Sequence, residues 1–218
     1  MGGKVKFDIG IDEVRKSPVI GSLVIGMVAV PEGYQQHLHT MGVKDSKKLY
    51  PKTLLKLDRT IRNHFPYRIF KISAEELSKA ENINDLEVEY IAKIIKYCYK
   101  RFEVRRIYID CVDVSARLMK LRLQKFGIKE FDNLVIQHYA DEIYPVVSAA
   151  SIVAKAYSDR EMSRIRKKFD CGSGEPADKK TRQFIYNSIL NNDTEALSII
   201  RKNWITYKRE YNKIHNSG

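Results

Sequence analysis

Hydrophobic and polar positions alternate along the first part of the chain, and a helical spacing of apolar residues takes over later. Residues 5–11 alternate, and 19–30 form a long apolar run rich in β-branched residues. Both segments are predicted to be strands, because this pattern suits a pleated and partly buried surface. A short turn ending at Pro18 would join them into a hairpin with Asp12 and Glu13 at its bend.

The remaining pattern predicts helices and strands in alternation, which is typical of an α/β fold. Small residues at 148–151 would let a long helix approach the sheet closely. The predicted helices cover 52–64, 74–79, 84–99, 114–126, 146–169 and 181–190, and the predicted strands cover 67–72, 105–110 and 134–138.

The length of 218 residues suits one main core with a small addition. A turn-rich patch at 171–178 separates the long predicted helix from a basic, helical last quarter. We therefore expect a main domain over 1–170 and a C-terminal helical extension over 171–218 that packs on it.

No apolar run approaches the roughly 18 residues of a membrane span, so no membrane association is expected. The first residues lack the apolar core of a signal peptide, and a cytoplasmic protein is predicted. Cys98, Cys111 and Cys171 lie far apart without the CxxC spacing of a zinc site. They are interpreted as reduced, structural residues.

The net charge of +12 favours a polyanionic partner. Lysine and arginine side chains that neutralise phosphates release condensed counterions, which gives affinity independent of sequence. Nucleic acid is therefore the favoured partner class. The alternative is that many of these lysines are merely solvated.

Four acidic residues follow or end predicted strands: Asp12, Glu13, Asp110 and Asp141. Sites in α/β sheets gather where strands end, and hard divalent metals prefer carboxylate oxygens. Such a set would suit metal-assisted hydrolysis of a phosphodiester. The alternative interpretation is that each acid is a solvated turn residue. His138 also lies at a strand end, but no nucleophile motif accompanies it, and a packed or supporting role is expected.

Several ordered motifs resemble those of archaeal-type ribonuclease HII. They are GIDE at 10–13, PVIG at 18–21, KDSKKL at 44–49, YID at 108–110, HYADEIYPVVSAASIVAKAYSDRE at 138–161, a GSGxPxD pattern at 172–178 and IIRKNW at 199–204. The resemblance implies a ribonuclease H-like fold with a central mixed five-stranded sheet flanked by helices, and a C-terminal extension that assists substrate binding.

The resemblance also implies an activity: a metal-dependent endonuclease that hydrolyses the RNA strand of RNA/DNA hybrids and leaves 5′-phosphate and 3′-hydroxyl ends. Its partner would be a hybrid or a ribonucleotide-containing duplex, and we expect a monomer. By position, Asp12, Glu13, Asp110 and Asp141 match the catalytic ligands of Mg²⁺ or Mn²⁺. The candidate substrate-binding residues are Arg15, Lys16, Ser17, Lys44, Ser46, Lys47, Tyr139, Ser148, Ser151, Lys155 and Glu175. For Ser148 and Ser151, close helix packing is the alternative.

The chain departs from the family pattern at three places. Arg15, Lys16 and Ser17 stand where the family has Gly-Arg-Gly, Glu175 replaces a tyrosine, and Tyr139 replaces a lysine. These places bear on substrate recognition, so weakened recognition of single ribonucleotides in DNA is expected. One alternative is an enzyme for another structured nucleic acid, such as double-stranded RNA. Another is a catalytically weak or inactive paralogue that binds hybrids.

Overall fold

The computed structural model describes residues 5–43, 46 and 49–215, and these form strands and helices in alternation. The strands are β1 (Lys6–Val14), β2 (Leu23–Pro31), β3 (Tyr67–Ile72), β4 (Glu103–Asp110) and β5 (Leu134–Gln137). The helices are α1 (Gln35–Thr40), α2 (Pro51–His64), α3 (Ala74–Lys79), α4 (Ile83–Arg101), α5 (Ala116–Lys125), α6 (Ala140–Ile143), α7 (Pro145–Lys168), α8 (Lys179–Leu190), α9 (Thr194–Ser198) and α10 (Ile205–His215).

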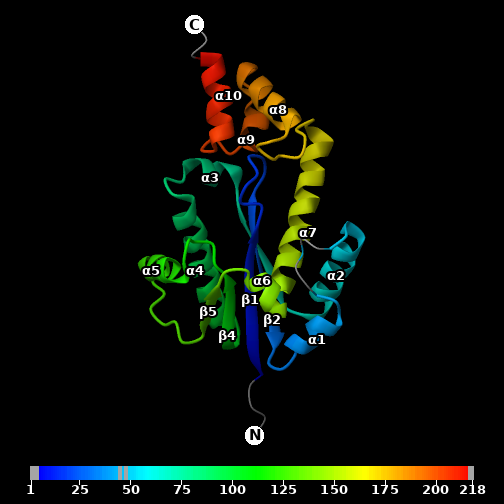
Figure 1. The fold of residues 1–218 in the computed structure, drawn as a ribbon, viewed down its shortest axis with the longest axis vertical. Helices are drawn as coiled ribbons and strands as arrows, with labels where there is room; N and C mark the ends of the chain where they lie inside the picture. Colours follow the sequence, from blue (N-terminus) through cyan, green and yellow to red (C-terminus); the bar gives the residue numbers. More distant parts are fainter. Residues whose placement is uncertain (1–4, 44–45, 47–48, 216–218) are drawn as a thin grey trace. The chain divides into compact units, whose positions relative to one another are not determined.

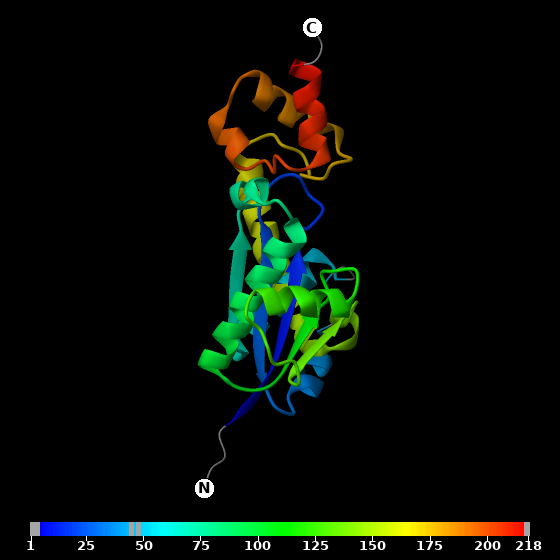
Figure 2. The same cartoon turned by 90° about the vertical axis from the view of Figure 1, so that its left-hand side faces the viewer.

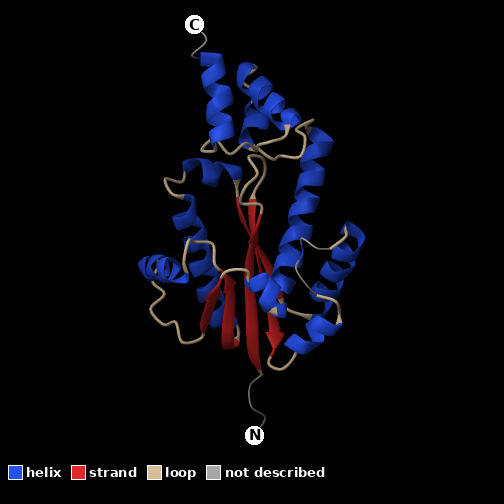
Figure 3. Ribbon diagram, viewed as in Figure 1, coloured by secondary structure: helices blue, strands red, loops and turns tan. Residues whose placement is uncertain are grey.

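The strands form one mixed five-stranded sheet in the order β3-β2-β1-β4-β5. β1 pairs antiparallel with β2, where Asp12 lies opposite Gly26. β1 pairs parallel with β4, and β4 pairs parallel with β5. Helices flank this sheet, with α4 and α5 on one side and α1, α2 and the first part of α7 on the other (Figures 1, 2 and 3). The predicted α/β fold is confirmed.

Two glycines in the sheet allow α7 to approach it at backbone distance. A Cβ atom on Gly10 would stand 2.1 Å from the carbonyl oxygen of Val146, and one on Gly26 would stand 2.3 Å from that of Ala150. No side chain fits in such a space. The close approach predicted from the small residues of α7 is confirmed, and the glycines opposite them are equally necessary.

The predicted hairpin is right in its pairing and wrong in its limits. β1 continues through Asp12 and Glu13 to Val14, so these acids lie within the strand and not at a bend. β2 begins only at Leu23, because Val19 and Ile20 are buried in a separate hydrophobic cluster. Ile20 there forms an isolated β-bridge with Ile200.

The chain divides into two compact units, which we name unit 1 and unit 2. Unit 1 holds the described residues of 1–14, 24–70 and 84–157, and unit 2 those of 15–23, 71–83 and 158–218. Unit 2 therefore takes in the turn after β1 and α3 besides the C-terminal helices. A catalytic domain ending at residue 170 stays a prediction.

The cysteines behave as the sequence predicts. Cys98, Cys111 and Cys171 are buried, and no disulfide joins these described residues. Burial raises the pKa of the Cys98 thiol to about 12, which keeps it protonated and unreactive. Within the described ranges, no helix has the length and apolar character needed to cross a bilayer.

Candidate active site and recognition turn

The order of the strands brings the predicted acids toward one edge of the sheet in unit 1. β1 and β4 are parallel neighbours, with Ile11 opposite Ile109, so the residues after this pair emerge at the same end. Asp110 is the last residue of β4 and lies beside Gln137, the last residue of β5. Asp141 follows in α6, a four-residue helix that the sequence pattern did not predict.

Two hydrogen bonds between backbone and side-chain atoms connect α6 to Asp110 and to α7. The Ala140 amide donates to a carboxylate oxygen of Asp110 at 2.9 Å. The Ser148 hydroxyl of α7 donates to the carbonyl oxygen of Asp141. Tyr139 precedes the helix with φ +57° and ψ +33°, a left-handed conformation rarely adopted by a residue with a side chain. This geometry turns the chain sharply from β5 into the helix that holds Asp141.

Asp12 lies in an environment that opposes its negative charge. Its side chain is buried, with a residue exposure of only 5%. Burial raises the pKa of Asp12 well above its ordinary value, and the charges of Glu13, Asp110 and Asp141 raise it further. A hydrogen bond with Ser151 acts in the opposite direction. The four carboxylates are therefore electrostatically coupled, as ligands of one cationic site would be.

Serines of α7 contact this set from within the protein. Ser151 is 1% exposed and Ser148 is 3% exposed. The hydroxyl of Ser151 lies 2.8 Å from that of Ser46. Either hydroxyl can be the donor in this bond. The serine hydroxyls thus contact Asp12 and the backbone of Asp141 from within the protein.

The arrangement of the carboxylates is more open than that of ligands around a bound ion. Among the residues that the structure describes, no group of three or more His, Cys, Asp or Glu side chains has the arrangement of a metal site. The donor set nevertheless fits a hard divalent ion, because oxygen ligands with excess negative charge are what Mg²⁺ and Mn²⁺ prefer.

The other candidate residues of unit 1 differ in their surroundings. Lys155 is half-buried, whereas His138 is exposed. His138 is therefore not packed in the core, and the supporting role stays a prediction. Tyr139 is 69% exposed, and its ring centroid lies 6.5 Å from that of His138. Lys44 and Lys47 lie outside the described residues.

Unit 2 holds the turn that follows β1, and the carbonyl oxygens of this turn are engaged by the C-terminal segment. Arg201, which is fully buried, donates from Nη1 to the Lys16 carbonyl at 3.0 Å and from Nε to the Gly21 carbonyl at 2.8 Å. The indole of Trp204 donates to the Ser17 carbonyl at 3.0 Å. The sequence singled out the IIRKNW motif, but the structural role of Arg201 was missed.

Arg15 takes an unusual conformation in this turn. Its φ is +68°, a region that costs a residue with a Cβ about 1–2 kcal/mol. The backbone thus keeps a glycine-like conformation although the side chain is an arginine. Lys16 is half-buried and Ser17 is exposed.

The Arg15 guanidinium lies within unit 2. Burial lowers its pKa, while Glu175, Asp159 and Glu161 act in the opposite direction. Its Nε and Nη2 atoms are buried and have no hydrogen-bond partner in the described part of the chain. The acids therefore act on these two buried nitrogens through charge and not through hydrogen bonds.

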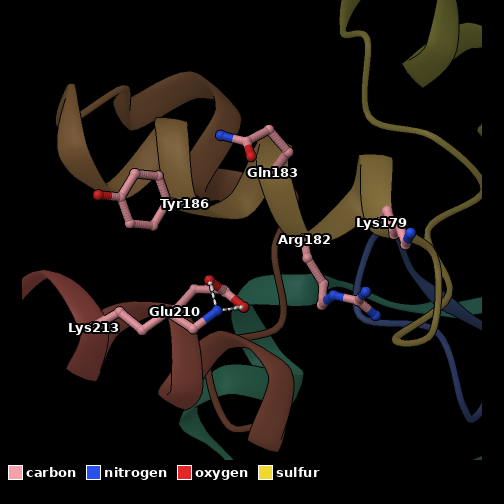
Figure 4. Close-up of a pocket in the computed structure, with 6 residues that line it drawn as sticks. All are labelled: Lys179, Arg182, Gln183, Tyr186, Glu210 and Lys213. Atoms are coloured by element: carbon pink, nitrogen blue, oxygen red, sulfur yellow. Dashed lines mark hydrogen bonds and ion pairs between the residues drawn. The ribbon is translucent and has the colours of Figure 1, made fainter.

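A separate pocket of about 430 Å³ lies between α8 and α10, and none of the predicted site residues lines it (Figure 4). Within its lining, Lys213 donates to both carboxylate oxygens of Glu210, at 2.8 and 2.7 Å. Its lining residues are Lys179, Arg182, Gln183, Tyr186, Glu210 and Lys213.

The mixed five-stranded sheet flanked by helices is the fold of a ribonuclease H-like enzyme, and comparisons with known proteins agree. The profile of the family Ribonuclease HII matches residues 9–207. A Ribonuclease HII of Methanosarcina acetivorans is 34% identical over 221 residues, covering 96% of this chain and 97% of the relative. The chain belongs to the ribonuclease HII family, and it is a ribonuclease H enzyme.

Solved structures support the same conclusion. The crystal structure of ribonuclease H2 from Pyrococcus horikoshii OT3 matches with a TM-score of 0.86 and 30% identity, over 97% of this chain and 100% of that one. A Bst-RNase HIII solved in complex with Mn²⁺ matches with a TM-score of 0.77. At 17% identity, over 98% of this chain and 71% of the other, it is a likeness of fold alone.

Proposed function

We propose that this enzyme cleaves the RNA strand of RNA/DNA hybrids and leaves 5′-phosphate and 3′-hydroxyl ends. The observation that supports the proposal is that the charges of Glu13, Asp110 and Asp141 act on the buried Asp12 in a member of the ribonuclease HII family. A solvated turn residue would have no reason to be as buried as Asp12 and Asp141, which are 5% and 2% exposed.

In this proposal Asp12, Glu13, Asp110 and Asp141 hold Mg²⁺ or Mn²⁺, which when bound supplies an activated water and stabilises the leaving oxygen. The protein's own contribution is to fix the ligands. The Ala140 amide orients Asp110, and Ser151 orients Asp12. Such supporting groups set the position and basicity of metal ligands.

Substrate contacts are proposed for residues around these acids. Lys155 would contact a backbone phosphate, and the exposed ring of Tyr139 would stack on a sugar or base of the hybrid. The position of Tyr139 two residues before Asp141 supports this role. Ser46, Ser148 and Ser151 would act close to the acids, where their hydroxyls already form hydrogen bonds.

We also propose that recognition of a single ribonucleotide in DNA is weakened. Arg15 and Ser17 carry side chains where glycines would let backbone groups approach a 2′-hydroxyl closely. Glu175 stands where the family has an aromatic side chain that could stack on a sugar, and a glutamate has no ring to do so. Both changes act on recognition and leave the metal ligands in place.

The decisive experiment is metal-dependent cleavage of three labelled duplexes. These are an RNA strand on DNA, a DNA duplex with one ribonucleotide, and double-stranded RNA, with D141N as the inactive control. Cleavage of the first with little of the second supports the proposal. Preferential cleavage of double-stranded RNA would indicate another substrate, and hybrid binding without cleavage would indicate a binding paralogue.

A further inference from the structure

The Arg15 side chain lies against the loop that carries Glu175. A Cβ atom built on Gly174 would stand 3.0 Å from Nη2 of Arg15, so the guanidinium lies directly on this glycine. Gly174 has φ +86°, and its carbonyl oxygen accepts a hydrogen bond from the Val19 amide at 2.9 Å. The turn after β1 and the loop before α8 are therefore joined by both a backbone bond and a side-chain contact.

The charges around Arg15 are mainly acidic. Glu175 belongs to the facing loop, and Asp159 and Glu161 belong to α7. Arg166 is the cation that opposes them, but its guanidinium donates to the carbonyl oxygens of Gly172 and Ser173, at 3.0 and 3.2 Å. Glu161 also accepts from the Ser22 hydroxyl at 2.9 Å. Among these acids Glu175 acts most strongly on Arg15, and it directly follows the glycine on which the guanidinium lies.

The backbone on both sides of this contact is already held. Arg201 and Trp204 engage the carbonyl oxygens of Lys16 and Ser17. On the facing loop, a carboxylate oxygen of Asp178 accepts from the amide of Ser173 at 2.6 Å. An arginine at φ +68° in so constrained a turn has few alternative directions for its side chain.

We propose that Arg15 and Glu175 form one specificity-determining unit, in which Arg15 is a positioning residue that neutralises Glu175 and does not bind substrate phosphate. This inference rests on the proposed hybrid cleavage and specifies how the recognition turn contributes to it. A carboxylate beside a polyanionic substrate is tolerated because its counter-charge comes from the same turn. Two of the three departures from the family pattern, at Arg15 and at Glu175, are thereby one coupled change.

The pairing is tested without substrate by a double-mutant cycle of R15Q, E175Q and R15Q/E175Q in thermal unfolding. Each single variant should unfold at a lower temperature, and the double variant should lose clearly less than the sum of the two. An exposed ion pair of the same unit, Lys79 with Glu75 at 2.6 Å, is the matched control and should show weaker coupling. Additive losses at Arg15 and Glu175 would overturn the proposal.

The role in recognition is tested by kinetics on the RNA/DNA hybrid. R15Q should raise KM several-fold with kcat unchanged, because it leaves Glu175 uncompensated near substrate. R15K, or the addition of E175Q to R15Q, should restore KM. A loss confined to kcat, or no rescue by either change, would contradict the proposal, since a merely structural defect lowers the active fraction instead.

The salt dependence of hybrid binding, measured without divalent metal, separates a positioning residue from a phosphate ligand. The double variant R15Q/E175Q keeps the net charge, so its slope of log Kd against log salt should equal that of the wild type. K155Q should reduce the slope by about one, as expected for a lost phosphate contact. A similar reduction in the double variant would show that Arg15 binds phosphate.

Wild-type protein that binds no hybrid would instead refute the proposed function. The unfolding cycle would still decide whether Arg15 and Glu175 are coupled.

Discussion

The candidate catalytic acids and the recognition turn are built in different ways. In unit 1, Asp12 and Asp110 belong to neighbouring parallel strands, so the sheet itself determines where they emerge. In unit 2, the segment after β1 forms the isolated bridge between Ile20 and Ile200, and the carbonyl oxygens of its turn accept hydrogen bonds from the side chains of Arg201 and Trp204. Asp12 and Asp110 are thus supported by a continuous strand ladder, and the turn by an isolated bridge and individual side chains.

This difference bears on the two departures from the family motifs that lie in unit 2, at 15–17 and at Glu175. A change among the four acids would remove a proposed metal ligand, and all four are present. The turn accepts a new side chain at Arg15, provided that a facing residue such as Glu175 changes with it. Recognition can therefore diverge while the chemistry stays the same, which is the usual relation between loops and scaffold.

The largest effect that tests this contrast between the acids and the turn is expected at Asp12. D12N should lower the rate of hybrid cleavage by more than about 100-fold, beyond the 10–100-fold typical of a lost supporting group. It should not lower the unfolding temperature, because the folded state already opposes the charged form of this buried carboxyl. Cleavage rates and thermal unfolding of one preparation measure both effects.

An active D12N, or one that is inactive because it is unfolded, would contradict the prediction. D132N changes an exposed aspartate in the loop before β5 and serves as the matched control. It should leave both the rate and the unfolding temperature unchanged.

A change at Arg201 should lower stability, in contrast to the change at Asp12. R201M removes the charge-assisted donors to the carbonyls of Lys16 and Gly21 and should lower the free energy of unfolding by about 1.5–3 kcal/mol. Denaturant unfolding measures this loss, and K202M, at a neighbouring exposed lysine, is the control. An R201M variant as stable as the wild type would mean that these bonds do not hold the turn.

Ser151 lies between these extremes. S151A should lower the cleavage rate about 10-fold and raise the metal concentration needed for half-maximal activity, because it removes the hydrogen bond that favours the charged form of Asp12. Metal titrations of the cleavage rate measure both quantities. S158A is the control, because Ser158 is a buried serine of the same helix whose hydroxyl has no partner among the described residues. Equal effects of the two variants would deny Ser151 a role in orienting Asp12.

The sequence predicted the elements that local pattern determines. The strand at 67–72 and the helix at 74–79 have the predicted limits, and Ser73 and Glu76 form a capping box at the start of that helix. The short helix α6 was missed because four residues give no periodicity, and its place depends on the bond from Ala140 to Asp110. The start of β2 was wrong because an apolar run does not reveal that Val19 and Ile20 pack in another cluster.

The candidate site divides in the same way. Asp12, Asp110 and Asp141 were found from strand ends and from the family motifs. The direction of the Arg15 side chain was not predictable, because it depends on Gly174, which is distant in sequence. The role of Arg201 could not be predicted from its sequence neighbours, because the Gly21 carbonyl that it contacts is distant in sequence.

The smallest effect is expected at Asp178, which closes the loop that carries Glu175. Its carboxylate accepts from the amide and hydroxyl of Ser173 and from the Lys180 amide, and these bonds lower the pKa of Asp178 to about 2 from its ordinary 3.8. Because the pKa is lower in the folded state, the stabilisation is present above pH 3.8 and is lost as the pH falls toward about 2. D178N should therefore lower the unfolding temperature at neutral pH, and its difference from the wild type should shrink across that acidic range.

D193N, which alters the cap of α9 with its single bond to the Ala196 amide, should have a weaker effect at neutral pH. A D178N penalty that stays constant down to about pH 2 would show that the loop is held by its backbone alone and would weaken the contrast between the two units.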